Sequence, residues 1–212
     1  PMEFLNSDKQ MIGFSIDLLH AMAELGTFKP QIDNVAWDNI FAGLAAGQYD
    51  AISSSVSITD ERKGTMDFSD PYFEVKQGVL VKKGAGIASV ADLKGKKVGA
   101  QIGTTGYFAA QKIEGAEPKS YDEIGLAVED LYNGGIDAAI CDDSVAYDFA
   151  LQNEKYKDAL DLAFLIVSDT PEYLGWAVQK GDPKGIIPVL NDALAKVKAS
   201  GKYDEIYAKW FK

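Results

Sequence analysis

Residues 97–106, KVGAQIGTTG, read as a buried strand that runs directly into a loop and then into a helical pattern. Such a unit of strand, loop and helix is the repeating element of α/β proteins. Helices are expected at about 14–25, 37–44, 121–133, 184–199 and 202–211 and near 142, and strands at 51–56, 97–102, 136–141, 161–167 and 173–180. This alternation predicts an α/β fold with mostly parallel sheets.

Candidate caps mark several of the expected helix ends. Gly47 and Gly134 stand where two helical patterns stop, which is typical of a glycine after the last helical turn. Asp38 is a candidate N-cap of the second helix. Ser120 and Glu123 have the spacing of a capping box for the helix that ends at Gly134.

The charge balance excludes some classes of partner. Lysine and arginine total 21 and aspartate and glutamate 32, so the net charge of the 212 residues is −11. An acidic surface repels nucleic acid and anionic membranes. No apolar run approaches the roughly 18 residues of a membrane span, and the first residues lack the basic and apolar regions of a signal peptide. The single cysteine, Cys141, excludes an internal disulfide and is expected to be buried.

Polar groups follow three of the predicted strands, at the strand ends where α/β proteins bind ligands. Arg62 ends the stretch SSSVSITDER and is the only arginine, a residue that grips a planar carboxylate with two parallel hydrogen bonds. The helix that starts near Thr104 and Thr105 offers backbone N–H groups to an anion. Asp142 can accept hydrogen bonds from an ammonium group. Together these groups would fit a zwitterion.

Each of these groups also has a purely structural explanation. Residues 59–61 can form a helix cap that leaves Arg62 in solvent. Thr104 or Thr105 can cap the helix that follows, and Asp142 can be the N-cap of another. The sequence does not show that the three strand ends meet.

Four motifs, in this order, carry a resemblance to a known family. SSSVSITDERK, DFSDPYF, LKGKKVGAQIGTT and GGIDAAICDD are similar to segments of the polar amino-acid-binding proteins of ABC importers (family 3, type II periplasmic binding proteins). The ligand-binding cores of eukaryotic glutamate receptors share this ancestral pattern. The resemblance covers essentially the whole chain.

The resemblance implies two Rossmann-like α/β lobes joined by two crossing strands, with an amino acid trapped between the lobes by hinge closure. Lobe one would comprise 1–76 and 176–212, and lobe two 77–175. In the family a short core strand and a pocket aromatic precede the position of Pro1, so both are expected to be missing here. The implied protein is a periplasmic or extracellular monomer, with or without a lipid anchor, whose partner is a membrane permease.

The resemblance also assigns roles to residues. Arg62 would clamp the ligand α-carboxylate with help from Ser57 and the backbone at Thr105. Asp142 would take the α-ammonium, helped by Ser55. A carbonyl of Ser54 or Ser55 would also contact the ammonium. Trp37, alternatively a core residue, would form an apolar or aromatic wall of the pocket. Gln101, Thr104 and Tyr107 would border the pocket.

One residue bears on the ligand side chain. Ser15 stands where an aspartate is common in relatives, in the pattern GF-D-x-D-L. This removes an acid that could have faced a basic head group, and burying an unpaired cation is costly. A neutral L-amino acid is therefore expected over a basic one.

The sequence gives little support for catalysis. His20 is the only histidine and lies inside an amphipathic helix, which excludes a histidine triad and most zinc sites. No phosphate-binding loop is present, and Cys141 lacks a basic partner. The sequence thus predicts a binding protein without cofactor or metal. A dehydratase acting on cyclic amino-acid precursors and a receptor sensor domain, both known on this scaffold, remain as alternatives.

Overall fold

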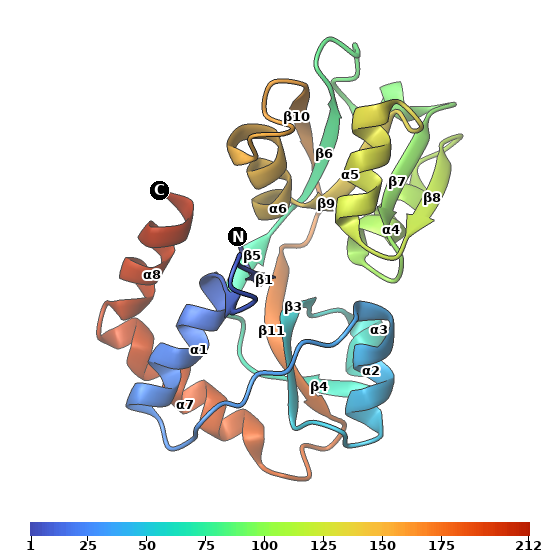
Figure 1. The fold of residues 1–212 in the computed structure, drawn as a ribbon. Coiled ribbons are helices and arrows are strands. Elements are labelled where there is room, and N and C mark those ends of the chain that lie inside the picture. The colour runs from blue at the N-terminus through green and yellow to red at the C-terminus, as the bar shows by residue number, and fades with distance from the viewer. The chain divides into compact units, whose positions relative to one another are not determined.

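The computed structural model describes residues 1–212, which form two compact units (Figure 1). Unit 1 consists of Pro1–Glu74 and Glu172–Lys212, and unit 2 of Val75–Pro171. The chain passes between them twice, within strand β5 (Phe73–Val75) and in the loop before strand β11 (Glu172–Gln179). The expected lobe boundaries, 76 and 175, lie two and four residues from the observed 74 and 171.

Unit 1 is built on a small sheet with strand order β3-β11-β4, to which β5 adds by pairing with β11. A separate hairpin, β1 with β2, occupies the N-terminal residues. The further elements of unit 1 are β1 (Phe4–Leu5), β2 (Met11–Ile12), α1 (Phe14–Leu25), α2 (Trp37–Ala45), β3 (Ala51–Ser57), α3 (Asp60–Lys63), β4 (Met66–Phe68), α7 (Ile186–Ala199) and α8 (Lys202–Phe211).

Unit 2 contains a five-stranded sheet in the order β10-β6-β9-β7-β8. Its elements are β6 (Gln77–Lys82), the 3₁₀ helix η1 (Val90–Leu93), β7 (Lys97–Gln101), α4 (Thr105–Lys112), β8 (Glu117–Tyr121), α5 (Ile124–Asn133), β9 (Ala138–Asp142), α6 (Asp143–Tyr147), the π-helix η2 (Asp148–Gln152) and β10 (Leu160–Ile166).

The expectation of mostly parallel sheets is wrong. In unit 2 only the pairs β7 with β8 and β7 with β9 are parallel, whereas β6 pairs antiparallel with both β9 and β10. In unit 1, β11 is antiparallel to β3 and β4. The reversed strands, β6 and β11, are the strands that follow the two crossings between the units.

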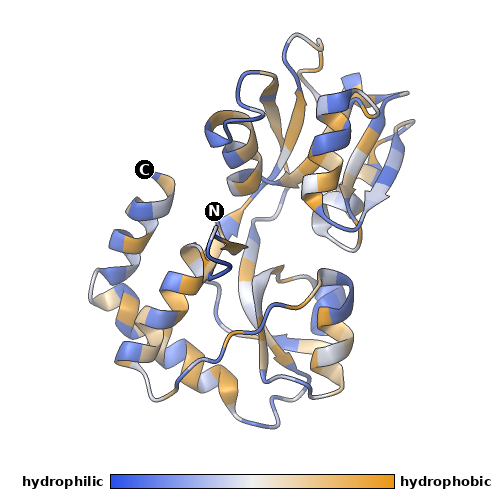
Figure 2. Cartoon of the chain, in the orientation of Figure 1, coloured by the Kyte–Doolittle hydropathy of each residue, from blue (hydrophilic) through white to orange (hydrophobic).

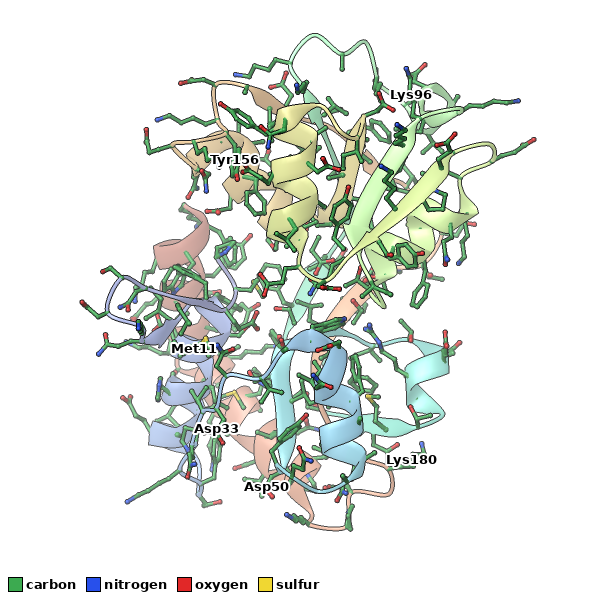
Figure 3. The ribbon with its side chains drawn as sticks, turned by 45° about the vertical axis from the view of Figure 1, so that its right-hand side comes forward. Met11, Asp33, Asp50, Lys96, Tyr156 and Lys180 are labelled. Atoms are coloured by element: carbon green, nitrogen blue, oxygen red, sulfur yellow. The ribbon has the colours of Figure 1, made fainter.

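The unit 2 sheet is buried on both faces. Successive residues of β6 point to opposite faces, so Leu80 joins a core with α5 and η2, whereas Val79 and Val81 join a second core with α4. Tyr156, labelled in Figure 3, packs into the first core, and its hydroxyl donates to the Glu129 carboxylate. The edge strand β8 is the exception, since it is mostly exposed and hydrophilic (Figure 2).

Unit 1 packs α2 against β3 and β11 through a core that includes Ile40, Leu44 and Val56. Phe14 of α1 is fully buried and contacts the aromatic rings of Tyr203 and Phe211 in α8. The two ends of the chain therefore contribute to the same core.

Two predicted caps are wrong. The N-cap of α2 is Ala36 rather than Asp38, and the Asp38 carboxylate accepts from the Asn39 side chain instead. Ser120 lies inside β8, and α5 begins after Glu123 without a side-chain cap, so no capping box forms. Gly134 does end α5 as predicted, with a left-handed φ of 85°.

Candidate ligand-binding site

Arg62 is held against the end of β3. Thr59 caps α3 by accepting a hydrogen bond from the backbone N–H of Arg62 at 3.2 Å, so the cap interpretation of this stretch is correct. The side chain nevertheless does not extend into solvent. Arg62 Nη1 donates to the Ser57 carbonyl at 2.9 Å, and Cζ lies 5.6 and 5.3 Å from the ring centroids of Trp37 and Phe41. The guanidinium is thus oriented by a carbonyl and two aromatic faces.

Trp37 serves two neighbours. Its ring meets Phe41 edge to face at a centroid distance of 5.0 Å, and both rings pack against the α2 core. The same indole borders the Arg62 guanidinium. The core interpretation and the pocket interpretation of Trp37 are therefore compatible.

The serines of β3 have different surroundings. Ser53 accepts from the Trp176 indole N–H at 3.0 Å, and Ser54 is half-buried. Ser57 is 3% exposed and donates to Glu172 Oε1 at 2.6 Å. Ser55 has a φ of 49°, in the left-handed region that non-glycine residues seldom adopt, a kind of strain that gathers at functional sites.

The strained Ser55 is tied to Glu3, a residue that the sequence analysis did not select. The Ser55 hydroxyl lies 2.9 and 2.8 Å from the two carboxylate oxygens of Glu3. Burial raises the pKa of Glu3, although the hydroxyls of Ser15 and Ser55 oppose this effect. The Ser15 hydroxyl lies close to the Glu3 carboxylate but makes no hydrogen bond of standard geometry. No sequence signal links residues 52 positions apart, so only the fold reveals this carboxylate.

In unit 2, Thr104 and Thr105 have different roles at the start of α4. Thr104 caps α4 by accepting from the Tyr107 backbone N–H at 3.2 Å, and its hydroxyl donates to the Gln101 carbonyl at 2.7 Å. Thr105 is the first residue of α4, at the helix end whose partial positive charge favours anions. Gln101 uses its amide elsewhere, donating to the Asp122 carbonyl at 2.9 Å.

Asp142 is the last residue of β9 and occupies the N-cap position of α6, yet its side chain makes no cap hydrogen bond. Instead, its Oδ1 accepts from Gln77 Nε2 at 2.8 Å. The same nitrogen donates to Thr105 Oγ1 at 3.1 Å. Gln77 thereby brings two predicted site residues together, and it too was missed, because its role depends on strand register.

Cys141 has no features of a nucleophile. Burial, followed by the charges of Asp142 and Asp143, raises the pKa of its thiol. A protonated thiol is a poor nucleophile. No group of three or more histidine, cysteine, aspartate or glutamate side chains is placed to hold a metal ion.

The ten predicted site residues therefore fall into two groups, one in each unit. Unit 1 holds five of them, Trp37, Ser54, Ser55, Ser57 and Arg62, and unit 2 holds five, Gln101, Thr104, Thr105, Tyr107 and Asp142. Their assignment to a ligand stays a prediction.

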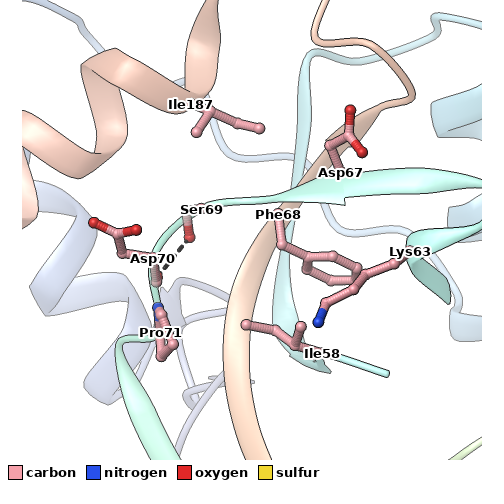
Figure 4. A pocket seen from close by; sticks show the side chains of 8 residues that line it. All are labelled: Ile58, Lys63, Asp67, Phe68, Ser69, Asp70, Pro71 and Ile187. Atoms are coloured by element: carbon pink, nitrogen blue, oxygen red, sulfur yellow. Dashed lines mark hydrogen bonds between the residues drawn. The ribbon is translucent and has the colours of Figure 1, made fainter. Parts of the chain in front are cut away.

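A pocket of about 460 Å³ in unit 1 contains none of these residues (Figure 4). It is lined by Ile58, Lys63, Asp67, Phe68, Ser69, Asp70, Pro71 and Ile187. Asp67 is occupied by hydrogen bonds from Lys180 Nζ and the Gly181 N–H, both at 2.7 Å, which lower its pKa. This pocket is therefore separate from the residues predicted to bind a ligand.

Comparison with known proteins places the chain in a family. The sequence model of the bacterial extracellular solute-binding proteins, family 3, matches residues 1–212. The chain belongs to this family. Both the α/β class and the type II periplasmic-binding-protein fold are thereby confirmed. None of its helices is long and apolar enough to span a bilayer.

Three relatives of this family 3 protein are informative. A "Probable histidine-binding protein" of Neisseria gonorrhoeae is 43% identical over 216 residues, covering 100% of this chain and 79% of the relative. The solved structure of the arginine-, lysine-, histidine-binding protein ArtJ from Geobacillus stearothermophilus matches with a TM-score of 0.90 and 38% identity, covering 100% and 90%. The ancestral amino acid-binding protein AncCDT-1, a precursor of cyclohexadienyl dehydratase, matches with a TM-score of 0.85 and 35% identity, covering 100% and 90%.

Proposed function

We propose that this family 3 protein binds a free L-amino acid outside the cytoplasmic membrane and delivers it to the permease of an ABC importer. The observation that carries the proposal is the oriented guanidinium of Arg62, a carboxylate-binding group in a chain whose relatives bind amino acids. The protein acts as a monomer, and nucleic acid is not a partner.

Arg62 takes the ligand α-carboxylate. A guanidinium carries enough N–H donors to keep the bond to the Ser57 carbonyl while it grips a carboxylate with a parallel pair. Ser57 and the backbone N–H of Thr105 assist, since the start of α4 favours negative charge. Trp37 supplies an apolar wall beside the guanidinium.

Asp142 takes the α-ammonium. Its carboxylate is an acceptor for the ammonium N–H groups, and the hydrogen bond from Gln77 favours the ionised form that this role requires. Ser54 and Ser55 contribute a carbonyl or hydroxyl, and Gln101 and Thr104 border the ligand.

Histidine is the first candidate ligand. The neutral ligand inferred from Ser15 rested on the loss of an acid, but Glu3 supplies a half-buried carboxylate next to Ser55. Of the relatives named above, one is a "Probable histidine-binding protein" and one is an arginine-, lysine-, histidine-binding protein. An imidazole with a pKa near 6.5 is mostly neutral at pH 7 and can still donate to a carboxylate. L-histidine therefore satisfies both considerations.

A calorimetric survey against the twenty L-amino acids tests the proposal. L-histidine should bind and N-acetyl-L-histidine should not, because acetylation removes the ammonium charge. Binding of none of the twenty would reject the function. Tight binding of the aliphatic amino acids, with histidine, arginine and lysine silent, would reject the ligand class and leave the carrier function standing.

A dehydratase is the second candidate, favoured only by the likeness to AncCDT-1, which is itself described as amino acid-binding. Incubation with prephenate or arogenate should yield no aromatic product. Release of phenylpyruvate or phenylalanine at a rate above that of the buffer would establish the enzyme instead.

A further inference from the structure

Gln77 is the first residue of β6 and is 7% exposed. Its neighbours on the two flanking strands are Asp142 of β9 and Ile166 of β10. A buried amide nitrogen in such a position needs specific hydrogen-bond acceptors, because an unpaired buried donor is costly.

The orientation of the amide is fixed by its partners. Asp142 Oδ1 lies 2.8 Å from Gln77 Nε2, and an ionised carboxylate only accepts hydrogen bonds, so the nitrogen must face it. The second N–H of the same group reaches Thr105 Oγ1 at 3.1 Å. One amide nitrogen therefore joins the end of β9 to the first turn of α4.

Gly106 allows this approach. A Cβ atom at Gly106 would lie 2.9 Å from Gln77 Oε1 and 2.9 Å from the Ile140 carbonyl oxygen. Real Cβ atoms essentially never come so close, and one of the two contacts is to backbone that cannot rotate away. Glycine thus lets α4 start close enough to β6 and β9 for the amide to bridge them.

We infer that Gln77 is a positioning residue for ligand binding, which fixes the ammonium acceptor Asp142 relative to the carboxylate-side residue Thr105. The inference rests on the proposed function and deepens it, because it connects the two ends of amino-acid recognition within unit 2. Gln77 acts through Asp142 and Thr105 and does not itself contact the ligand.

If Gln77 acts through Asp142, the effect of a Gln77 substitution on ligand affinity should depend on pH. If Gln77 only packs, that effect should be the same at every pH. A donor to a carboxylate favours ionisation, so loss of the Gln77 donor should make Asp142 protonate at a higher pH and release the ammonium earlier on acidification. Other titratable groups in this region include Cys141, Asp143 and Lys76. Wild type and variant share these groups, so the ratio of the affinities of the two proteins for L-histidine isolates the change at Asp142.

Gln77→Met tests the inference, with Gln179→Met as the matched control. Gln179, like Gln77, is a glutamine in a strand. Its side-chain amide donates a hydrogen bond to the Ala45 carbonyl at 3.2 Å. Calorimetric titration with L-histidine at several pH values between 5 and 8 is the measurement. Gln77→Met should weaken binding about tenfold at pH 8, as expected for a hydrogen bond to a charged group, and by a larger factor at pH 5. Gln179→Met should bind like wild type at every pH.

A double-mutant cycle supplies the second criterion. If Gln77 acts through Asp142, the loss caused by Gln77→Met should largely disappear in an Asp142→Asn background. A loss that is constant with pH and additive with Asp142→Asn would show a merely structural role and overturn the inference. Unchanged binding by Gln77→Met would overturn it as well.

Folding failure of Gln77→Met would move the test to Gln77→Asn. The shorter amide keeps a donor but cannot reach both partners, so the same dependence on pH is expected, and its absence overturns the inference. A wild-type chain that binds no amino acid rejects the proposed function and this inference together. A wild-type chain that binds, alongside a Gln77→Met variant that binds equally well, rejects only the role of Gln77.

Discussion

The two units hold their predicted recognition groups by different means. In unit 1, the long side chain of Arg62 is oriented by the Trp37 and Phe41 rings and by one backbone carbonyl. In unit 2, the short side chains of Asp142 and Thr105 are joined through one buried amide. A long cation thus depends on packing, whereas short polar groups depend on the register of neighbouring strands. Substitutions should therefore have different signatures in the two units.

The largest expected effect is at Arg62. Removing one member of a desolvated charge pair costs about 3–5 kcal/mol, so Arg62→Ala should weaken L-histidine binding by more than about a hundredfold in calorimetry. Arg62→Lys should recover little, because an ammonium cannot reproduce the planar fork. Lys63→Ala is the control, since Lys63 is exposed and pairs only with Asp60 at 3.7 Å. Affinity of Arg62→Ala within a few-fold of wild type would remove the arginine from the site.

Asp142→Asn should have the next largest effect. The amide cannot neutralise an ammonium, and a hydrogen bond to a charged group is worth about 1.5–3 kcal/mol, so binding should weaken about ten- to a hundredfold. The melting temperature should change little. If the variant instead keeps its affinity and accepts N-acetyl-L-histidine, Asp142 has only a structural role at the start of α6.

Two glycines offer a matched comparison for the unit 2 arrangement. Gly106 and Gly125 are each the second residue of a helix, α4 and α5. A Cβ atom at Gly125 would meet nothing within 4 Å, so Gly125→Ala should stabilise the protein by up to about 1 kcal/mol without affecting binding. Gly106→Ala should lower the melting temperature and weaken binding by about tenfold, because the Gln77 amide must move. Equal behaviour of the two variants would contradict the close packing described here.

The smallest effect is expected at Glu3, and it concerns stability. Burial raises the pKa of Glu3, so the folded chain holds the proton more tightly than the unfolded chain. The free energy of unfolding therefore falls as the pH rises from the ordinary carboxyl pKa to the raised one. Glu3→Gln removes this loss and should raise the melting temperature by roughly a few degrees at pH 7, and by less at pH 4.

Glu24→Gln, an exposed substitution on α1, is the control for Glu3 and should shift the melting temperature equally at both pH values. The prediction for Glu3 fails if Glu3→Gln also shifts the melting temperature equally at the two pH values. Scanning calorimetry at the two pH values measures both.

Local patterns were sufficient to predict most helices and several of their caps. The helix at Phe14–Leu25 was predicted from its apolar spacing, and Thr59 and Thr104 cap the helices that they precede. Strand β8 was not predicted, because Pro118 and its polar neighbours lack the alternation of a half-buried strand. Proline is tolerated there because β8 is an edge strand.

The features that could not be predicted from the sequence depend on contacts between residues that are far apart in the chain. The direction of β6 and β11 follows from their position at the crossings between units, and no local residue encodes it. The pairing of Glu3 with Ser55, and of Gln77 with Asp142, joins residues 52 and 65 positions apart. Arg62 was selected because it is the only arginine in the sequence, but its contact with the Phe41 ring was not foreseen.

The position of β11 between β3 and β4 has a consequence for the order in which the protein is made. The ribosome completes β3 and β4 early, then all of unit 2, and only afterwards β11, the strand that pairs with both. At about 5–20 residues per second this interval lasts on the order of ten seconds. During that time unit 2 is contiguous and can fold, whereas β3 and β4 present unpaired edges that invite association with other chains. Protection by chaperones during synthesis therefore matters most for unit 1.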